Sequence, residues 1–326
     1  MNNKAKNVRA NLRIVHQNHT FRKAGKYCIN IPRAHSLVVK RYFDIVKSGG
    51  SIPPVPTNFM DKQIKLEPDF GIPLDIIYED KDIIILNKQA GISVHPSVNE
   101  PNKTLVNALI AKYPEIKNVG DPSPPAGGSG QDNLRPGIVH RLDKDTSGVL
   151  VVAKNQKTFE FLKKEWQEGK VIKKYFALVW GHPKEKGEIV SELTRSLKDF
   201  RKRMVVRPEK NKGIKGPAGS RQSGTNRAGK MAITEYKVVK KFRDYSLVEV
   251  CPKTGRMHQI RVHLASLGHP VVGDKIYGKS KEKPKGLTRQ FLHAFYLKFS
   301  LPAGRSLAFE ADLPDDLEQV LAKLDK

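Results

Sequence analysis

The sequence has few cysteines and no long apolar run. Its two cysteines, Cys28 and Cys251, are too few for a disulfide or metal-binding framework, which is typical of a protein in a reducing compartment. No apolar segment approaches the length of a membrane span, and the N-terminus MNNKAKNVRANLRIV lacks the apolar core of a secretion signal. These absences predict a cytoplasmic protein with no membrane partner.

Acidic residues are also scarce relative to basic ones. The 326 residues include 33 Asp and Glu against 59 Lys and Arg, which gives a formal net charge of +26. A field of this sign attracts polyanions, and nucleic acid is the first candidate because Lys and Arg neutralise its phosphates. A run of charges is usually a solvated surface, but an excess of this size favours a nucleic-acid partner.

The segment from Arg135 to Asn155, RPGIVHRLDKDTSGVLVVAKN, has the pattern strand, polar loop, strand. Charged side chains gather on the loop, and catalytic residues are often found on loops held by rigid flanks. Asp143 lies close in sequence to His140, Arg141 and Lys144, and nearby positive charge favours the ionised carboxylate. Such a carboxylate can act as a nucleophile or a base, although a salt-bridged turn is the ordinary role of a charged loop.

The segment VIKKYFALVWGHP, which begins at Val171, predicts a strand because it is dense in β-branched and aromatic residues. Tyr175 lies at its centre. A tyrosine in a strand is ordinarily a packing residue, so the pattern alone assigns it no chemical role.

The segment RMHQIRVHLASLGHP predicts a helix from Met257 to Leu267, with a glycine at its C-terminal end and a proline just beyond. His258 and Arg261 then share one helical face. A metal site formed by His258 and His263 is disfavoured, because this spacing puts the two histidines on different faces and no third ligand is placed.

Three segments of the chain resemble, in the same order, motifs of the RluA family of RNA pseudouridine synthases. RPGIVHRLDKDTSG resembles the family signature, whose catalytic aspartate corresponds to Asp143. KKYFALVWG resembles the segment that carries the active-site tyrosine, here Tyr175, and TGRMHQIRVH resembles the third motif, whose second arginine corresponds to Arg261. The resemblance covers about residues 73 to 317, and three motifs in the family's order are highly specific.

The resemblance implies that uridine in RNA is isomerised to pseudouridine: the glycosidic bond breaks, the uracil turns, and C5 is joined to C1′. A carboxylate near the sugar would either attack C1′ or remove the 2′ proton. The target uridine must be flipped out of its stack. The reaction includes neither a redox step nor hydrolysis, so we expect no cofactor and no metal.

The expected substrate is structured RNA, with large-subunit ribosomal RNA as the commoner target in the family and transfer RNA as an alternative. The resemblance and the basic composition together predict a set of residues that bind this RNA around the catalytic group. These residues are His140, Arg141, Lys144, Lys230, Arg256 and His258.

Several strand pairs with few helices between them predict an α+β fold, with a mixed, largely antiparallel sheet and flanking helices. The pseudouridine synthase fold that the resemblance implies is of this kind. We expect residues 1–72 to form a basic N-terminal arm or small RNA-binding extension, with a Pro-rich linker, and residues 73–326 to form the catalytic domain of a monomer. The S4 RNA-binding domain that many relatives carry is not recognisable in residues 1–72.

Two glycine-rich segments are predicted to be loops. Residues 121–134 would form a mobile flap beside the site or a tolerated insertion, and residues 208–228 would contact phosphates through their Lys and Arg side chains. Gly224 to Lys230 also fits the spacing of a nucleotide-binding P-loop. This function is excluded because Met231 replaces the required Ser or Thr and a strand pattern follows.

Two other functions use some of the same features. A non-catalytic RNA-binding or ribosome-assembly protein would need the positive charge but not Asp143, Tyr175 and Arg261 together. An N-glycosylase would use a carboxylate at C1′ but would release the base. Detection of free uracil would therefore distinguish a glycosylase from an isomerase.

Overall fold

The computed structural model describes residues 65–97, 100–121, 135–196, 199, 202–206, 229–278 and 283–325, together with the backbone of three short N-terminal strands. The chain divides into two compact units, Met1–Lys62 and Gln63–Lys326. The Pro-rich linker and nearly all of the two glycine-rich loops lie outside the described residues.

The first unit contains a three-stranded antiparallel sheet in the order β1, β2, β3. Its strands are β1 (Ile14–Val15), β2 (Thr20–Lys23) and β3 (Tyr27–Asn30).

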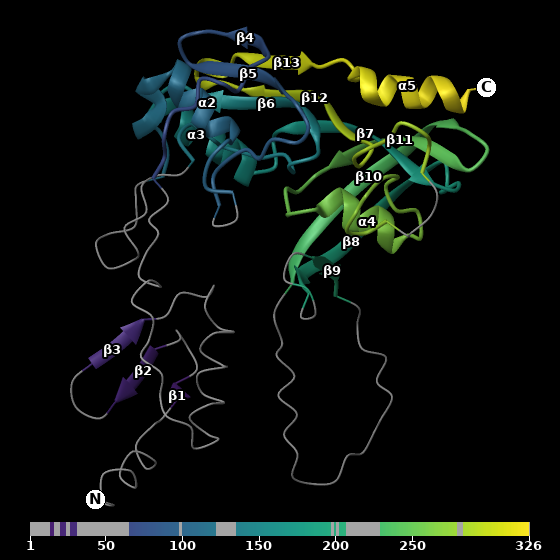
Figure 1. Ribbon diagram of the computed structural model, residues 1–326, viewed down its shortest axis with the longest axis horizontal. Helices are drawn as coiled ribbons and strands as arrows, with labels where there is room; N and C mark the ends of the chain where they lie inside the picture. Colours follow the sequence, from purple (N-terminus) through teal and green to yellow (C-terminus); the bar gives the residue numbers. More distant parts are fainter. Residues whose placement is uncertain are drawn as a thin grey trace, which may run out of the picture. The chain divides into compact units, whose positions relative to one another are not determined.

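The second unit is built on a ten-stranded sheet (Figure 1). Nine strands follow one path across it, and β13 (Ser306–Glu310) pairs with β12 beside that path. The path is β4 (Ile76–Glu79), β5 (Ile83–Lys88), β6 (Ser147–Ala153), β12 (Leu292–Ser300), β7 (Ile172–Trp180), β11 (Tyr245–Pro252), β10 (Lys230–Lys241), β8 (Lys186–Arg195) and β9 (Arg203–Val205).

The sheet is mixed but almost wholly antiparallel. Its parallel pair joins β6 to β12, and the other described pairings are antiparallel. The predicted α+β fold with a largely antiparallel sheet is therefore confirmed. β10 begins at Lys230, so a strand follows the glycine-rich segment and the exclusion of a P-loop is also confirmed.

The described helices flank this sheet. They are α2 (Leu105–Lys112), α3 (Gln156–Gln167), α4 (Gln259–Ser266) and α5 (Asp315–Leu324). In Figure 1, α2 and α3 lie beside the part of the sheet that contains β4 to β6, whereas α4 lies beside β8 and β10. The side chain of Asn155 caps α3 by accepting a hydrogen bond from the backbone N–H of Thr158.

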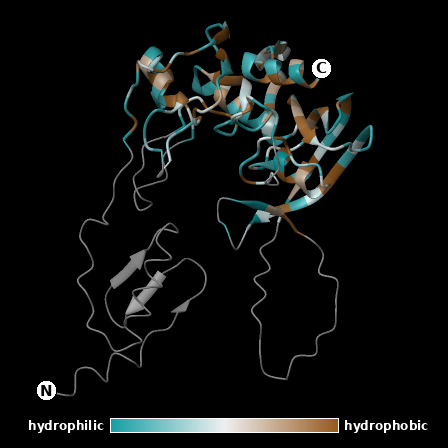
Figure 2. Cartoon of the chain, turned by 45° about the vertical axis from the view of Figure 1, so that its right-hand side comes forward, coloured by the Kyte–Doolittle hydropathy of each residue, from teal (hydrophilic) through white to brown (hydrophobic). Residues whose placement is uncertain are grey.

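The core is deepest at β5 and β6. Ile83 to Leu86 are almost fully buried, and all seven residues of β6 are buried. Ile83 to Leu86 and Val149 to Ala153 are continuous apolar runs rather than alternating ones, which is expected of strands covered on both faces. Hydrophobic residues are accordingly concentrated along the strands, while the helices carry both hydrophobic and hydrophilic residues (Figure 2).

The second unit begins before the boundary expected near residue 72. Leu66 is buried in the main core, and the side chain of Asn107 in α2 donates a hydrogen bond to the Glu67 carbonyl oxygen at 2.6 Å. The Asp69 N–H also donates to the Asn107 carbonyl oxygen, at 3.0 Å. These contacts attach the residues before Pro73 to the larger unit.

Helix α4 begins two residues later than the sequence predicted. His258 has a left-handed backbone conformation, with φ of 57°, so it precedes the helix instead of sharing a helical face with Arg261. The side chain of Gln259 holds this turn, because it donates to the Ile233 carbonyl oxygen and accepts from the Arg256 N–H, both at 2.9 Å. The predicted start at Met257 was therefore wrong.

Candidate active site

The loop that carries Asp143 depends on two glycines in its flanks. Gly137 has φ of 69°, and a side chain there would place its Cβ 2.5 Å from the Ala153 carbonyl oxygen. Gly148 has φ of 119°, and a Cβ there would lie 2.1 Å from the Ala294 carbonyl oxygen across the parallel β6–β12 pair. Only glycine allows these close approaches, which fix both ends of the loop.

The loop is held from behind by Lys88, at the end of β5. Its buried ammonium donates hydrogen bonds to the carbonyl oxygens of Gln89, Lys144 and Thr146, at 2.7, 3.1 and 2.9 Å. Burial lowers the pKa of Lys88 to about 7, although the negative charge of Asp143 opposes the shift. The Lys88 side chain thus connects the end of β5 to the loop backbone at Lys144 and at Thr146.

A second buried cation, Arg289, supports the same loop. Its guanidinium binds both carboxylate oxygens of Asp316, at 2.7 and 2.9 Å. The remaining hydrogen bonds reach the Asp145 carbonyl oxygen and the Ser147 hydroxyl, both at 3.2 Å. The loop is therefore fixed by one side chain from β5 and one from the segment that precedes β12.

Arg261 bridges two aspartates. Its Nη1 lies 2.8 Å from Oδ2 of Asp143, while its Nε and Nη2 bind the two carboxylate oxygens of Asp274 at 2.7 and 2.9 Å. Burial alone would lower the pKa of Arg261, but its hydrogen bonds and the charges of both aspartates outweigh this effect and raise it. The guanidinium thus stays positively charged. The buried carboxylate of Asp274 fixes its orientation, so that Nη1 faces Asp143.

His258 approaches the same carboxylate oxygen of Asp143 as Arg261 does. Its Nε2 is 4.0 Å from Oδ2 of Asp143, and its Nδ1 is 3.0 Å from the hydroxyl of Tyr277. The Tyr277 hydroxyl accepts a hydrogen bond of 2.7 Å from the Arg203 backbone N–H, so its own proton is available for donation to Nδ1 of His258. Burial lowers the pKa of His258, although Asp143 opposes the shift, and the neutral ring then carries its proton on Nε2, facing Asp143.

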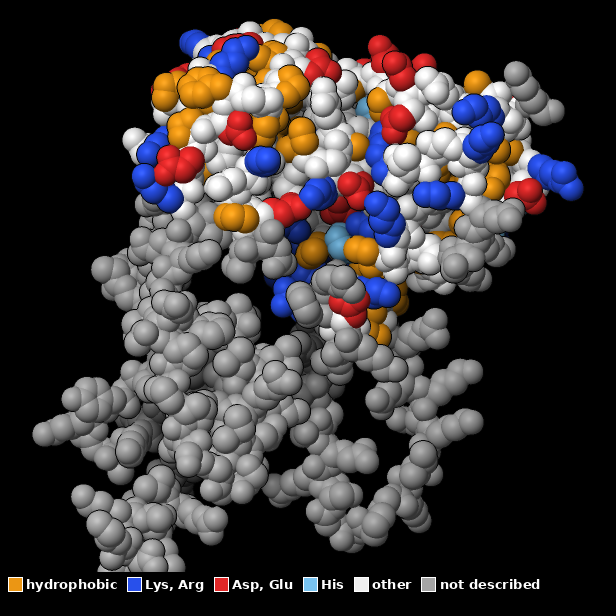
Figure 3. Space-filling model, viewed as in Figure 1, with side chains coloured by type: hydrophobic (Ala, Val, Ile, Leu, Met, Phe, Trp, Pro, Cys, Tyr) orange, Lys and Arg blue, Asp and Glu red, His pale blue; other side chains and the backbone are white. Residues whose placement is uncertain are grey.

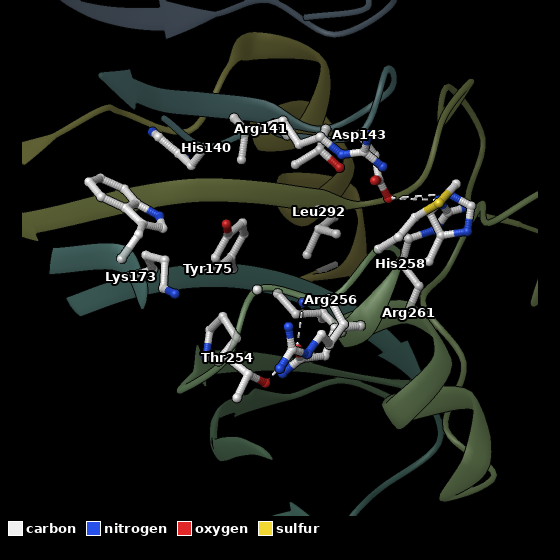
Figure 4. Close-up of a pocket in the computed structure, with 18 of the residues that line it drawn as sticks. His140, Arg141, Asp143, Lys173, Tyr175, Thr254, Arg256, His258, Arg261 and Leu292 are labelled. Carbon is white, nitrogen blue, oxygen red and sulfur yellow. Dashed lines mark hydrogen bonds and ion pairs between the residues drawn. The ribbon is translucent and has the colours of Figure 1, made fainter. Parts of the chain in front are cut away.

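Tyr175 projects from β7 into a cavity of about 290 Å³ whose lining also includes Asp143 and Arg261. Figure 4 shows its hydroxyl directed into this space, with Lys173 and Leu292 on either side of the ring. Burial and the charge of Asp143 raise the pKa of Tyr175, so the phenol remains protonated. Within the described part of the chain, no hydrogen bond is made by this hydroxyl.

His140 lines the cavity and also anchors its wall. Its ring stacks on Trp166, with 4.6 Å between centroids, and its Nε2 accepts a hydrogen bond of 3.1 Å from the Val151 N–H. Burial, together with the positive charge of Lys173, lowers the pKa of His140 to about 3. The ring is therefore neutral, and its anchoring contacts were not predicted from the sequence.

The other residues predicted to bind RNA are placed differently from one another. Arg141 and Arg256 are exposed and line the cavity, where basic side chains surround a hollow on this face of the molecule (Figure 3). Lys144 forms an ion pair with Glu100 and lines an adjacent hollow instead. Lys230 is exposed at the start of β10 and is not part of the cavity lining.

Four residues of the site were not predicted as functional from the sequence: Lys88, Lys173, Asp274 and Tyr277. Lys88 and Asp274 occur in the strings NKQAG and GDKIYG, where a charged side chain precedes or follows turn residues. That pattern signals a turn but not the burial or the tertiary partner that gives each residue its role.

The described residues contain no group of three or more His, Cys, Asp and Glu side chains arranged to hold a metal ion. Among the same residues, no helix is long and apolar enough to cross a membrane.

Comparisons with known proteins agree with the motifs. Residues 82–266 match the family model described as RNA pseudouridylate synthase. An RNA pseudouridine synthase of Chloroflexus aurantiacus, described as uncharacterized, is 44% identical over 239 residues, which cover 73% of this chain and 65% of that protein. The ribosomal large subunit pseudouridine synthase D of Escherichia coli is 34% identical over 274 residues, which cover 80% of this chain and 73% of that protein.

A solved structure has the same fold. Human RNA pseudouridylate synthase domain containing 4 superimposes with a TM-score of 0.56 at 24% identity, covering 77% of this chain and 93% of that one. The family match and the curated relatives show that the chain is an enzyme that isomerises uridine in RNA. Within that class, the chain belongs to the RluA family of RNA pseudouridine synthases, as its three motifs indicated.

Proposed function

We propose that this enzyme converts specific uridines to pseudouridine in large-subunit ribosomal RNA. The observation that carries the proposal is the meeting of three groups at one cavity: the carboxylate of Asp143, the guanidinium of Arg261 and the ring of Tyr175. The choice of substrate is supported by relatives in Escherichia coli and Zymomonas mobilis, both named ribosomal large subunit pseudouridine synthase D. Transfer RNA is the second candidate substrate.

Asp143 is proposed as the catalytic group at the sugar. It would either attack C1′ or remove the 2′ proton, and both routes need an ionised carboxylate. Arg261 supports that state, since its Nη1 donates a charge-assisted hydrogen bond of 2.8 Å to Asp143. Asp274 holds the guanidinium by two hydrogen bonds, so Arg261 needs little reorganisation when the substrate binds.

Tyr175 is proposed to stack on the flipped uracil. Its ring lines the cavity, and its protonated hydroxyl has no described partner that the base would have to displace. The hydroxyl would assist the loss of the C5 proton after the base has turned. An aromatic ring of this kind contributes about 1–3 kcal/mol of stacking per base in other single-strand-binding proteins.

The basic residues around the cavity are proposed to bind the RNA. Arg141 directly precedes Leu142 and Asp143, so it is placed to fill the space left by the flipped uridine or to hold a phosphate. Arg256 lies across the cavity from this loop, and both side chains are exposed, as phosphate contacts require. His140 and His258 would contact the nucleotide, while Lys144 and Lys230 would bind RNA outside the cavity. We also propose that residues 1–72 extend this RNA contact and that the enzyme acts as a cytoplasmic monomer.

The proposal is tested with purified protein and unmodified large-subunit ribosomal RNA transcribed in vitro. Pseudouridine mapped at one or a few positions is the expected result, and cells that lack the protein should lack the same modifications. Free uracil without pseudouridine would identify an N-glycosylase instead. Binding without any modified nucleoside, on both ribosomal and transfer RNA, would support a ribosome-assembly role.

A further inference from the structure

One buried cation at the cavity has no role in the functions described above. Lys173 is only 8% exposed, and in the described part of the chain its ammonium forms neither an ion pair nor a hydrogen bond. The adjacent Lys174, by contrast, lies 3.4 Å from the carboxylate of Glu249. Burial lowers the pKa of Lys173.

None of the described residues has a side-chain nitrogen or oxygen that is fully buried without a hydrogen-bond partner, so the Lys173 ammonium is open to the cavity that it lines, where a ligand can accept its hydrogen bonds. Lys173 lines the same cavity as Tyr175 and lies two residues before it on β7. Residues two apart on a strand project to the same face. Figure 4 shows the two side chains side by side, so a ligand stacked on the Tyr175 ring would lie within reach of the Lys173 ammonium.

Because Lys173 is buried, it is better placed to contact the flipped base than the phosphates of the RNA. Phosphates of a bound strand stay largely solvated, and the exposed side chains of Arg141 and Arg256 at the cavity are suited to them. The flipped base enters the cavity instead, where His140 is neutral and cannot supply positive charge. Lys173 is therefore a buried cation that faces the base-binding part of the cavity.

We propose that Lys173 donates a hydrogen bond to a carbonyl oxygen of the bound uracil and stabilises the anion that forms when the glycosidic bond breaks. This inference rests on the proposed function. Whether Asp143 attacks C1′ or removes the 2′ proton, the C1′–N1 bonding electrons leave with the uracil, and its negative charge spreads to the carbonyl oxygens. The ammonium transfers no proton and stabilises this charge in a water-poor site, as oxyanion-hole donors do elsewhere.

The test compares Lys173→Met, Lys173→Arg and Lys174→Met in single-turnover reactions at saturating RNA. Lys173→Met should lower the rate about 100- to 1,000-fold, because one donor to a developing anion is lost. Lys173→Arg should keep most of the rate, and Lys174→Met, the matched control on the same strand, should not change it. Affinity for RNA should stay within about threefold of wild type, since phosphate contacts are unaffected.

A second substrate separates charge stabilisation from a structural role. Fluorine at C5 stabilises the uracil anion, so RNA with 5-fluorouridine at the target needs less help from Lys173. The rate of loss of the N-glycoside, measured by mass spectrometry after digestion, should fall much less for Lys173→Met on this RNA than on the uridine RNA. Thermal unfolding of each variant provides the folding control, and Lys173→Arg serves if Lys173→Met is unstable.

Three results would overturn this role. Equal defects on the two RNAs would mean that Lys173 does not act on the leaving base. A loss of RNA affinity with a reduced salt dependence would assign it to a phosphate, and wild-type rates in Lys173→Met would show that it has no part in the reaction while leaving the proposed function intact. Absence of pseudouridine with the wild-type enzyme would instead refute the proposed function, and this role with it.

Discussion

The ammonium nitrogen of Lys88 lies 2.9 Å from the carbonyl oxygen of Thr146, directly behind the loop that carries Asp143. The same group donates to the carbonyl oxygens of Gln89 and Lys144. Lys88→Met removes all three hydrogen bonds and loosens the loop. We expect kcat for pseudouridine formation to fall about tenfold or more while affinity for RNA is kept, because the loop positions the catalytic group.

The buried lysine also predicts a pH dependence of stability. Its pKa is about 7 in the native protein against 10.5 for an ordinary lysine, so between these values the native state binds fewer protons than the unfolded state. Relative to Lys88→Met, the wild-type free energy of unfolding should therefore rise with pH from about pH 7 to pH 10, by up to about 1.4 kcal/mol per pH unit. Urea unfolding at several pH values measures this difference.

The exposed Lys157 on α3 provides the control, since Lys157→Met should leave the pH dependence of stability unchanged. Parallel pH curves for wild type and Lys88→Met would show that Lys88 titrates in the native protein as it does in the unfolded chain.

Asp143→Asn should abolish isomerisation while RNA binding survives. The amide keeps the size of the side chain and loses the charge that either route to C1′–N1 cleavage needs. We expect kcat to fall at least about a thousandfold, with Kd for RNA within about threefold of wild type. Asp145→Asn is a matched control on the same loop, and its rate should stay near that of wild type. If the Asp143→Asn enzyme kept a tenth of the wild-type turnover, the assignment would be disproved.

Local sequence patterns predicted the strand that follows the Asp143 loop and the strand that carries Tyr175. Local residue types also mark three helix starts, since Asn155 and Thr104 are the N-caps of α3 and α2 and Pro314 directly precedes α5. The start of α4 was predicted wrongly, because the turn before it depends on hydrogen bonds from Gln259 to residues of β10 that are distant in sequence. Propensity cannot represent such a contact.

The site was predicted only in part, for the same reason. Asp143 and Arg261 were each found in a motif, but they are 118 positions apart, and their hydrogen bond depends on the order of strands in the sheet. Asp274 and Lys88 take their roles from burial and from partners elsewhere in the chain. A side chain with no special local pattern gives no sign of these properties before the chain has folded.

Asp274→Asn tests whether the buried carboxylate positions Arg261. The side chain of Asp274 is fully buried, and its loss of charge leaves the guanidinium with one anionic partner, Asp143. Removing one member of a buried ion pair costs about 3–5 kcal/mol, so we expect a lower free energy of unfolding as well as a lower kcat. Asp80→Asn, at a partly exposed ion pair with Arg305, should cost much less than this.

Stability alone would not prove a positioning role, so the comparison of kcat with Kd for RNA is the deciding measurement. With fewer hydrogen bonds to its guanidinium, Arg261 should position Asp143 less precisely, and kcat should fall by more than the loss of folded protein explains while Kd stays near that of wild type. A kcat lowered only in proportion to the folded fraction would reduce Asp274 to a structural residue.

Tyr175→Phe and Tyr175→Ala distinguish the two roles proposed for this side chain. Phenylalanine keeps the ring that stacks on the flipped base and loses only a hydroxyl that has no hydrogen-bond partner among the described residues. We therefore expect nearly wild-type RNA affinity for Tyr175→Phe, with a slower step after the base has turned.

Tyr175→Ala should lower the RNA affinity as well as the rate of that step. The lost stacking corresponds to about 1–3 kcal/mol, or about 5- to 150-fold in the binding of the reacting uridine. Equal losses in the two variants, with thermal unfolding unchanged, would count against stacking.

Deuterium at C5 of the target uridine tests the role of the hydroxyl by itself. If the hydroxyl assists removal of that hydrogen, the isotope effect should be larger in Tyr175→Phe than in wild type.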